Sequence, residues 1–438
     1  MAEDLLAKAA AAVETARRAG ADEAVARLAG GWSTEFVMRQ GRVEKVQQSR
    51  SSSLQLRLHV EGRYSTHATS DLRPEAVASF VADAVALTRH LQADAQRLIP
   101  DPALYEDRAA VDLELRDPAV EGISRETCLE WLGSMDAAAG ADERVISASS
   151  QVSYGRYEGA QASSNGFSGA SLGTTAGYGA SVTLDEGDGR RPEAYRYVRA
   201  RHLGDLPPPA EVAGDALQRA LARLGSAKAP SARTKMVVDP EAGGSLLGRL
   251  AGALGAQAVQ QNRSFMAGRA GERVASDLLH LSDEPLLKRG LGSRLFDGEG
   301  IAARPLPLVE GGVLRNYYVD TYYGRKLGWA PTTGGSSNVA LLGGEGDLEG
   351  LLKAAGDGFY VTGWLGGNAD ETSGDFSFGF RGFRLEGGRV GAPVGEMNVT
   401  GNYADLLQRL EAVGADANPW SSWRTPTLVF GDVEFSGT

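Results

Sequence analysis

The sequence predicts an α+β fold, in which N-terminal α/β units with antiparallel sheets precede a larger, β-rich C-terminal domain with a few helices. Short runs that alternate polar and apolar residues recur along the chain, as is typical of half-buried strands. Helical patterns flank these runs, and 57 glycines indicate many tight turns and hairpins. A chain of 438 residues is too long for one typical core, so we expect two or three domains.

The first predicted domain, residues 1–100, places antiparallel strands between two helices. An Ala-rich helix is predicted over residues 4–19. Strand patterns then flank turns at residues 40–41 and 61–62, where a glycine permits a tight bend. A second helix is predicted over residues 74–90, because its apolar residues recur near one side.

The second predicted domain, residues 110–226, is entered through a linker at residues 95–118 that is rich in Pro and Asp. One helix is predicted over residues 124–139 and another over residues 211–224. Between them, residues 145–185 alternate small polar and apolar residues, which predicts a meander of antiparallel strands.

The third predicted domain, residues 230–438, begins with a short strand at residues 235–238. Asp239-Pro240 then supplies a helix cap followed by proline at the first helical position, which is a strong helix start. The helix that follows carries leucines on one face. These leucines are Leu246, Leu247, Leu250 and Leu254.

Beyond residue 300 the pattern of the third domain becomes mainly that of strands. Hairpins are predicted around the turns at residues 310–312 and 386–388. A late helix is predicted over residues 403–413, with Gly414 as its stop. The chain is predicted to end in a strand over residues 427–433.

Composition and charge exclude several classes of function. The net charge is −11 and the basic residues are scattered, whereas a nucleic-acid binder needs clustered Lys and Arg. The single cysteine, Cys128, cannot form an intrachain disulfide, and its helical surroundings favour a buried hydrophobe over a nucleophile. The N-terminus lacks the pattern of a signal peptide, and no stretch approaches the about 18 apolar residues of a membrane span. We therefore expect a cytoplasmic protein that contacts neither nucleic acid nor membrane.

The sequence predicts no catalytic residue and no metal ligand in this chain. Its five histidines are far apart, whereas a zinc peptidase helix needs two histidines one turn apart so that both reach one metal. One cysteine cannot make a Cys-x-x-Cys site. Neither a Gly-x-Ser-x-Gly elbow nor a Walker loop occurs.

Two polar segments are candidates for a binding or catalytic site. Asp370, Glu371 and Asp375 precede a run in which phenylalanine alternates with small residues. These carboxylates suit acid–base chemistry, but on spacing alone we favour a polar loop that leads into a strand with its phenylalanines on one face. The other segment, residues 316–323, contains tyrosines suited to line a peptide groove or to pack in the core and rim of a sheet.

Ordered segments of the chain resemble the TldD/PmbA family of paired bacterial subunits. The resemblance is firm from about residue 230 onward and looser in the N-terminal third, where residues 39–44 carry it. The firm segments are residues 296–300, 316–322, 373–379, 383–388, 393–394 and 401–403.

In this family the catalytic subunit resembles a zinc peptidase, with His-Glu-x-x-x-His at the start of a helix and a Cys ligand near its C-terminus. Here the matching helix start, residues 239–244, reads Asp-Pro-Glu-Ala-Gly-Gly, and no cysteine follows Cys128. Glu241 remains in that region, but without a metal to lower the pKa of a water it has little chemistry to perform. The chain is therefore similar to the PmbA type, also called TldE, which lacks the motif.

The resemblance implies a non-catalytic, metal-free subunit of a TldD/TldE-type metallopeptidase complex. Its partner would be a TldD-like subunit that carries the His-Glu-x-x-x-His motif and the zinc, and the two would form a hetero-oligomer such as a heterodimer. Together they would bind and cleave unfolded peptides or leader peptides. The residues expected to contact such a substrate are Asn316, Tyr317, Asp320, Tyr322, Gly374, Asp375 and Ser377. The family name "modulator of DNA gyrase" reflects an indirect link, and the acidic charge gives no reason to expect contact with DNA.

Two alternatives remain open at this point. The chain can be a stand-alone peptide-binding or scaffold protein, as a homo-oligomer for example, without peptidase activity. It can also be an independent hydrolase that uses Asp370, Glu371 and Asp375. Whether the chain needs a second subunit, and whether a chelator abolishes hydrolysis, distinguish the three hypotheses.

Overall fold

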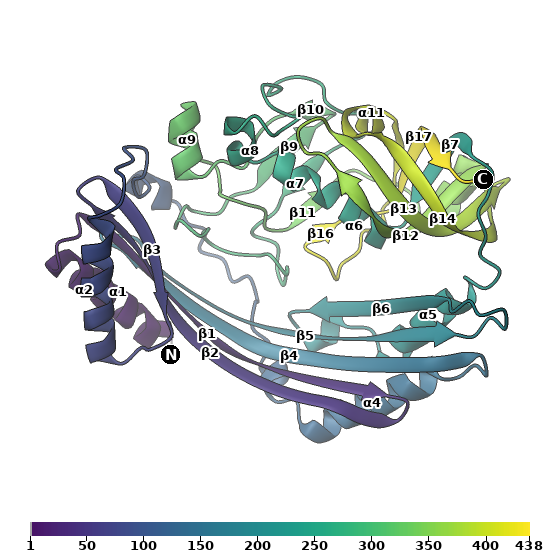
Figure 1. Ribbon diagram of the computed structural model, residues 1–438, viewed down its shortest axis with the longest axis horizontal. Coiled ribbons are helices and arrows are strands. Elements are labelled where there is room, and N and C mark those ends of the chain that lie inside the picture. Colours follow the sequence, from purple (N-terminus) through teal and green to yellow (C-terminus); the bar gives the residue numbers. More distant parts are fainter. Residues whose placement is uncertain (1) are drawn as a thin grey trace.

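The computed structural model describes residues 2–438 and has two layers that face each other (Figure 1). A hollow that is lined by residues of both layers lies between them. The lower layer is one curved sheet with helices on its outer side, and the upper layer is the β-rich C-terminal part (Figure 1). This arrangement confirms the predicted α+β class with a β-rich C-terminal region. No helix within residues 2–438 is both long enough and apolar enough to cross a membrane.

The lower layer is a six-stranded antiparallel sheet in the order β3-β2-β1-β4-β5-β6. It contains strands from both the first and the second predicted domain, because β1 pairs with β4 over its length. The predicted turns at residues 40–41 and 61–62 join β1 to β2 and β2 to β3. The strands are β1 Glu23–Arg39, β2 Arg42–Val60, β3 Arg63–Thr69, β4 Val145–Ser163, β5 Ser168–Leu184 and β6 Glu193–Ala200.

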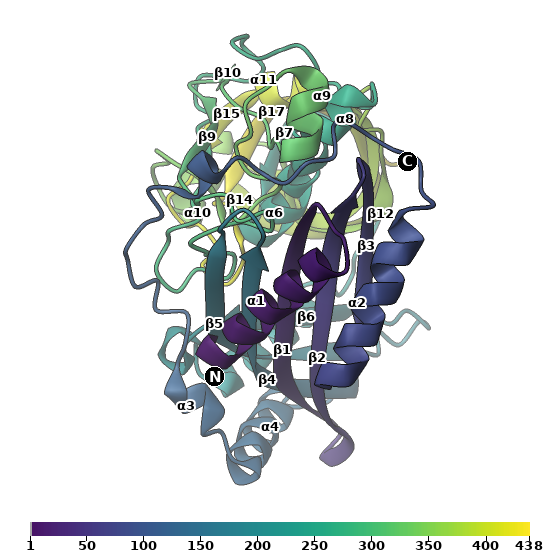
Figure 2. The same cartoon turned by 90° about the vertical axis from the view of Figure 1, so that its left-hand side faces the viewer.

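Helices cover only the convex face of this sheet (Figures 1 and 2). Residues of β1 alternate between the two sides, so that Leu28 and Phe36 are buried under helices whereas Arg27 and Ser33 face the hollow. Alternation of this kind leaves one face of an antiparallel sheet open. The helices of the lower layer are α1 Ala2–Arg18, α2 Pro74–Thr88, α3 Pro118–Glu121, α4 Arg125–Ala139 and α5 Pro209–Leu221, with short 3-10 turns at Pro102–Tyr105 and Leu203–Asp205.

The segment predicted as a linker, residues 95–118, is bonded to both layers. The backbone carbonyl of Leu104 accepts from Ala302 in the upper layer, and that of Leu115 accepts from Thr174 in the lower one. The predicted meander of residues 145–185 is a single hairpin of two long strands, β4 and β5. Cys128 is fully buried in α4, which confirms its packing role.

The upper layer contains a six-stranded sheet in the order β14-β13-β12-β7-β17-β15, and an additional pairing of β14 with β17 closes five of these strands into a ring. Phe359, Phe380 and Phe435 meet inside the ring, with centroids 4.6 to 5.8 Å apart. The predicted one-sided burial of Phe376, Phe378 and Phe380 is confirmed. The strands are β7 Ala232–Val238, β12 Gly358–Ala369, β13 Asp375–Glu386, β14 Arg389–Asn402, β15 Leu410–Val413 and β17 Leu428–Ser436.

A smaller sheet and short helices complete the upper layer. The sheet has the order β10-β9-β8-β11-β16, and the predicted hairpin at residues 310–312 joins its first two strands. Its strands are β8 Leu281–Asp283, β9 Leu306–Glu310, β10 Val313–Leu314, β11 Val339–Leu341 and β16 Trp423–Arg424. The helices are α6 Pro240–Gly248, α7 Leu250–Ala253, α8 Ala256–Gln260, α9 Thr321–Leu327, α10 Leu348–Ala355 and α11 Tyr403–Gln408.

Two helix predictions in the third domain are wrong in extent. The late helix ends at Gln408, and residues 410–413 form β15, which pairs with β17. Leu410 and Val413 have the three-residue spacing of a helix face, and β15 buries both because its register shifts between Leu410 and Ala412. Pairing with the edge of β17 decides for the strand. The helix that starts at Pro240 breaks at Arg249, although all four predicted leucines are buried.

Candidate functional site

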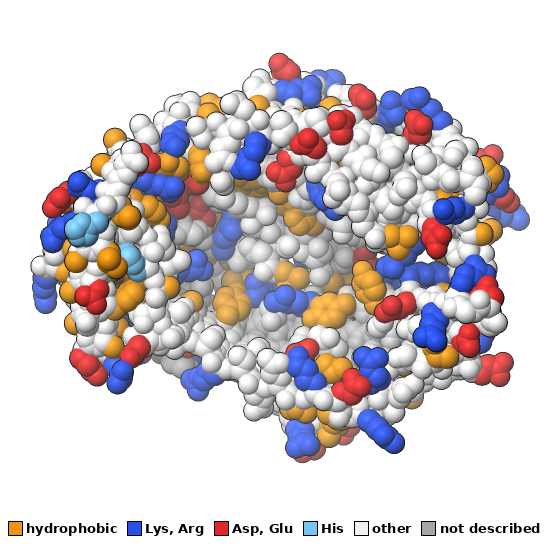
Figure 3. Space-filling model, in the orientation of Figure 1, with side chains coloured by type: hydrophobic (Ala, Val, Ile, Leu, Met, Phe, Trp, Pro, Cys, Tyr) orange, Lys and Arg blue, Asp and Glu red, His pale blue; other side chains and the backbone are white. Residues whose placement is uncertain are grey.

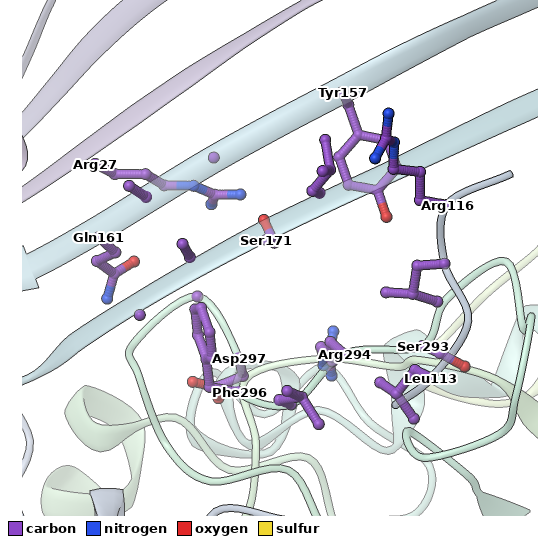
Figure 4. Close-up of a pocket in the computed structure, with 18 of the residues that line it drawn as sticks. Arg27, Leu113, Arg116, Tyr157, Gln161, Ser171, Ser293, Arg294, Phe296 and Asp297 are labelled. Atoms are coloured by element: carbon purple, nitrogen blue, oxygen red, sulfur yellow. The ribbon is translucent and has the colours of Figure 1, made fainter. Parts of the chain in front are cut away.

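A cavity of about 800 Å³ lies in the hollow between the layers (Figure 3). Its floor is the concave face of the lower sheet, and its roof is a loop at residues 293–299 of the upper layer. Figure 4 shows Arg27, Tyr157 and Gln161 extending from the sheet into the space opposite Arg294 and Phe296 of the roof. Both charged and apolar groups therefore line a space large enough for several residues of an extended peptide.

The floor continues into a second cavity of about 510 Å³ that is lined by serine, glycine and aromatic residues. Small side chains on this face of the sheet leave open space above it. Some of the glycines are required because neighbouring atoms lie against their Cα atoms. A Cβ atom at Gly173 would lie 2.3 Å from the hydroxyl of Tyr157, so only glycine leaves room for that ring. The outer edge of this floor is β2, whose residues 42–53 are all exposed.

Two carboxylates organise the roof loop, of which Asp297 is buried and Glu299 is half-buried. Asp297 accepts backbone hydrogen bonds from Glu299 at 2.8 Å and Ile301 at 3.0 Å, so the loop folds around its side chain. Glu299 accepts 2.8 Å bonds from both the backbone and the hydroxyl of Thr321, and burial raises the pKa of its carboxyl. These bonds position Phe296 against Phe167 of the lower layer at 5.1 Å between ring centroids.

The predicted binding residues at 316–322 take mainly structural positions. The Tyr317 ring is buried and stacks on Trp329, and its hydroxyl donates to the carbonyl of Met266. Asn316 donates to the carbonyl of Pro307 at 2.7 Å, and Asp320 caps α9 by accepting from the Tyr323 backbone.

Tyr322 joins the upper layer to the lower one, because its hydroxyl donates to Asp94 at 2.8 Å and the Arg97 guanidinium lies 3.4 Å from its ring centre. Of the seven predicted binding residues, Asp320 lines a cavity, a pocket of about 290 Å³ that it shares with Glu371.

The other predicted residues, near 374–377, form the tight turn that starts β13. Gly374 has a φ of +85°, which glycine adopts without strain. Asp375 accepts from Asn402 at 2.9 Å and from Ser373 at 2.8 Å, and these hydrogen bonds lower the pKa of its carboxyl. Ser377 is exposed on β13.

The carboxylates of the hydrolase alternative do not converge in one place. Asp370 accepts a 2.8 Å bond from the Thr372 backbone, which lowers its pKa. A carboxyl whose pKa is lowered cannot hold a proton as a general acid near neutral pH. Glu371 points instead toward α7, where a Cβ atom on Gly252 would meet its carboxylate. The contacts therefore favour the polar-loop interpretation.

Sequence profiles of all three PmbA/TldA metallopeptidase domains match the chain. Domain 1 matches residues 24–88, the central domain residues 118–224, and the C-terminal domain residues 231–437. The chain belongs to the PmbA/TldD family. The match covers both layers, so the hollow between them lies within the family fold.

Relatives of the chain within the PmbA/TldD family include named metalloproteases. It is 27% identical to the metalloprotease PmbA of Escherichia coli over 95% of this chain and 92% of the relative. A crystal structure of a proposed modulator of DNA gyrase from Bacteroides thetaiotaomicron is 36% identical, with a TM-score of 0.95 and coverage of 99% and 98%. TldE from Thermococcus kodakarensis has the same fold, with a TM-score of 0.85 at 19% identity over 98% and 100% of the two chains.

The start of α6 is the place to test whether this PmbA/TldD member fits a zinc ion. If Glu241 occupies the Glu position of His-Glu-x-x-x-His, the two imidazole positions fall on Pro240 and Ser245, neither of which supplies an imidazole. Glu241 accepts bonds from Arg219 at 3.0 and 3.1 Å and also pairs with Arg196. Within residues 2–438 no group of three or more His, Cys, Asp or Glu is placed to hold a metal ion. The residues at this helix therefore do not fit the metal.

Sequence reasoning missed the arginines around α6. Arg196 lies on β6, Arg219 on α5 and Arg381 on β13, so no spacing along the chain connects them. Asp215 ties the first two together, with contacts of 3.2 Å to Arg196 and 3.1 Å to Arg219. The excess of acidic residues in the whole chain conceals this local concentration of positive charge.

Proposed function

We propose that this chain is the metal-free subunit of a two-chain metallopeptidase of the TldD/TldE type, and that the zinc and the catalytic residues belong to a TldD-like partner subunit. The observation that carries the proposal is the state of Glu241. Two guanidinium groups hold its carboxylate, so it is available neither as a metal ligand nor as a base that activates water. The partner must then supply the catalytic groups.

The role left to this chain is to bind an extended peptide. The glycine- and serine-rich floor of the hollow suits a main chain that lies flat on it, and Arg27, Gln161 and Arg294 offer polar contacts along the way. Ser49, Ser51 and Ser53 of β2 belong to that floor, and residues 42–53 bond on one side to β1 while β3 pairs with β2 only from Leu54 onward.

A peptide that adds to this open edge enters the hollow with backbone hydrogen bonds and little side-chain selectivity, as an unfolded substrate or leader peptide requires. The binding residues predicted from the sequence stay part of the proposal. Among them, Asp320 and Tyr322 are the ones whose positions suit direct contact or support, since Asp320 lines a pocket and Tyr322 fixes the upper layer to the lower one.

Reconstitution tests the proposal. The chain is purified alone and together with a PmbA/TldD-family subunit that contains His-Glu-x-x-x-His, and cleavage of an unfolded peptide is followed with and without a chelator. Cleavage should require both chains, should stop on chelation, and should coincide with a hetero-oligomer on size-exclusion chromatography. Metal analysis of the isolated chain should give much less than one ion per chain.

A matched control places the metal in the correct subunit. Exchange of the first motif histidine of the partner for alanine should abolish cleavage, whereas Glu386→Gln in this chain, on an exposed strand end, should leave it unchanged. Stoichiometric metal together with hydrolysis by the isolated chain would overturn the proposal. Binding of the peptide by the isolated chain without any effect of the partner would favour the scaffold alternative.

A further inference from the structure

A separate cavity of about 620 Å³ lies beside α6, at the end of the hollow where α5 and β6 approach β12 and β13 (Figure 1). Figure 3 shows blue Lys and Arg side chains gathered between the layers at the right-hand end of the hollow. Four arginines line the cavity, together with aromatic rings and three carboxylates. The arginines are Arg219, Arg223, Arg249 and Arg381, and the carboxylates are Asp215, Asp239 and Glu241.

The carboxylates of this cavity are already engaged. Asp215 and Glu241 each form ion pairs with both Arg219 and Arg196. Asp239 caps α6 and accepts 2.9 Å bonds from the hydroxyl of Tyr360 and from the backbone of Glu241. No carboxylate of the lining therefore remains to neutralise the other arginines.

Three of the arginines have no carboxylate partner within residues 2–438: Arg223, Arg249 and Arg381 have no ion pair in that part of the chain. Arg223 donates to the backbone carbonyl of Glu193, whose own carboxylate accepts from Ser181. The Nε atom of Arg381 is buried without a hydrogen-bond partner among the described residues. A buried donor left unpaired costs free energy, which a suitable ligand atom would recover.

Aromatic rings and a glycine lie against two of the guanidinium groups. Arg381 lies 5.4 Å from the ring centre of Tyr195, and Arg249 lies 4.6 Å from that of Phe378. A Cβ atom on Gly363 would come 2.7 Å from Nε of Arg381, so glycine makes room for the guanidinium. A guanidinium group over an aromatic ring can still donate through the N–H groups at its edge, and such an edge matches the two oxygens of a carboxylate or phosphate.

Like charges are kept close together here at a cost to the folded chain. Burial, together with the nearby Arg381 and Arg219, lowers the pKa of Arg223 to about 10. An anion that enters the cavity would relieve this repulsion and would pair with donors that are already oriented, so little free energy would be spent on ordering them.

We propose that this cavity binds an oxyanion, either a carboxylate or a phosphate group, through Arg223 and Arg381. The resemblance places the metal of the catalytic subunit at the matching helix start. In this chain arginines rather than imidazoles surround the start of α6, and their positive charge favours an anion over a cation there. The inference is independent of the partner subunit and stands if the proposed function fails.

Isothermal titration calorimetry of the full-length chain tests the inference with three probes: inorganic phosphate, N-acetyl-alanyl-alanine with a free C-terminal carboxylate, and its C-terminal amide. We expect saturable binding of phosphate or of the free carboxylate, and none of the amide. Arg223→Gln and Arg381→Gln should each raise Kd by about ten-fold or more, since each removes a charge-assisted contact. Arg384→Gln, on the same strand but exposed and paired with Glu386, is the matched control and should change Kd less than about two-fold.

Thermal unfolding keeps the test informative if a variant binds nothing. Without added anion, Arg381→Gln should unfold at the wild-type temperature or above it, because the substitution removes repulsion and breaks no ion pair of the described chain. It should also lose the rise in unfolding temperature that the bound probe gives the wild type. Phosphate binding alone would assign a phosphoryl group to the cavity, and carboxylate binding without amide binding would assign a peptide C-terminus. Absence of saturable binding of both phosphate and the free carboxylate would overturn the inference. Binding that persists in a chain carrying both Arg223→Gln and Arg381→Gln would overturn it as well.

Discussion

Substitution of Glu241 by glutamine separates a structural role of this residue from a catalytic one. In the wild type, Glu241 and Asp215 balance the charges of Arg196 and Arg219. Glutamine keeps the size of the side chain but leaves two guanidinium groups with one carboxylate. The arrangement that forms the start of α6 should therefore become less stable, whatever the chain does as an enzyme subunit.

The size of the effect follows from the exposure of the groups. The side chains are 14% exposed for Arg196, 28% for Glu241 and 31% for Arg219, between the buried and the fully exposed case. Breaking a buried pair costs about 3–5 kcal/mol, whereas an exposed pair is worth about 0–1 kcal/mol. The bidentate pairing of Glu241 with Arg219 favours the upper part of this range. The ion pairs that Asp215 still makes with both arginines favour the lower part, so we expect a loss of about 2 kcal/mol.

Urea denaturation and hydrogen exchange of α5 and α6 measure this loss. A cost of about 2 kcal/mol corresponds to about 30-fold faster exchange where amides exchange through the same opening. The double variant with Arg219→Gln should recover part of the loss, because the unpaired charge is then gone. The control Glu386→Gln concerns an exposed pair and should change stability by less than about 0.5 kcal/mol. Unchanged stability and exchange in Glu241→Gln, combined with loss of peptide cleavage in the reconstituted complex, would refute the structural role.

Three further predictions follow from buried groups. Burial lowers the pKa of His59 to about 4, and its Nδ1 donates to the carbonyl of Arg97. As the pH falls, the unfolded chain therefore binds a proton at His59 before the folded chain does. Up to about 3 kcal/mol of stability, fully present above pH 6.5, should be lost as the pH falls toward 4. His59→Gln should flatten this part of the pH profile of urea unfolding, and an unchanged slope would assign it to other groups. Phe380→Ala should cost about 3–5 kcal/mol, because the side chain is 0% exposed within the ring of strands, and a loss below 1 kcal/mol on denaturation would show that the ring is loosely packed. Gly173→Ala should displace the Tyr157 ring from the floor of the hollow and weaken binding of a labelled unfolded peptide in fluorescence polarisation, and unaltered affinity would place the peptide elsewhere.

Local signals in the sequence were sufficient where a short segment decides its own structure. The cap and proline at Asp239-Pro240 start α6, and the glycine turns at residues 40–41 and 386–388 join strands as predicted. The helix prediction for residues 410–413 was wrong because Leu410 and Val413 have the spacing of a helix face, whereas a register shift lets β15 bury both of them. The strand formed because β17 offered unpaired backbone groups to bond with.

The candidate site, too, could be predicted from the sequence only in part. The lack of paired histidines and of a second cysteine was visible in the sequence, and so was the turn that contains Gly374 and Asp375. The hollow could not be predicted from the sequence, because the residues of its floor and those of its roof are far apart along the chain. The predicted tyrosine at position 317 belongs to the core, since an amphipathic ring fits a buried position with a carbonyl partner as well as a groove.

The sequence by itself determined the α+β class, the turns, the burial pattern of the strands and the family resemblance, because these depend on residue types within a few positions of one another. Only the tertiary structure decided that the first two predicted domains share one sheet and that the layers enclose a hollow. It also decided that arginines from β6, α5 and β13 surround the start of α6. The physical reason is that charge interactions act across space over several ångströms, so their partners need have no relation in sequence.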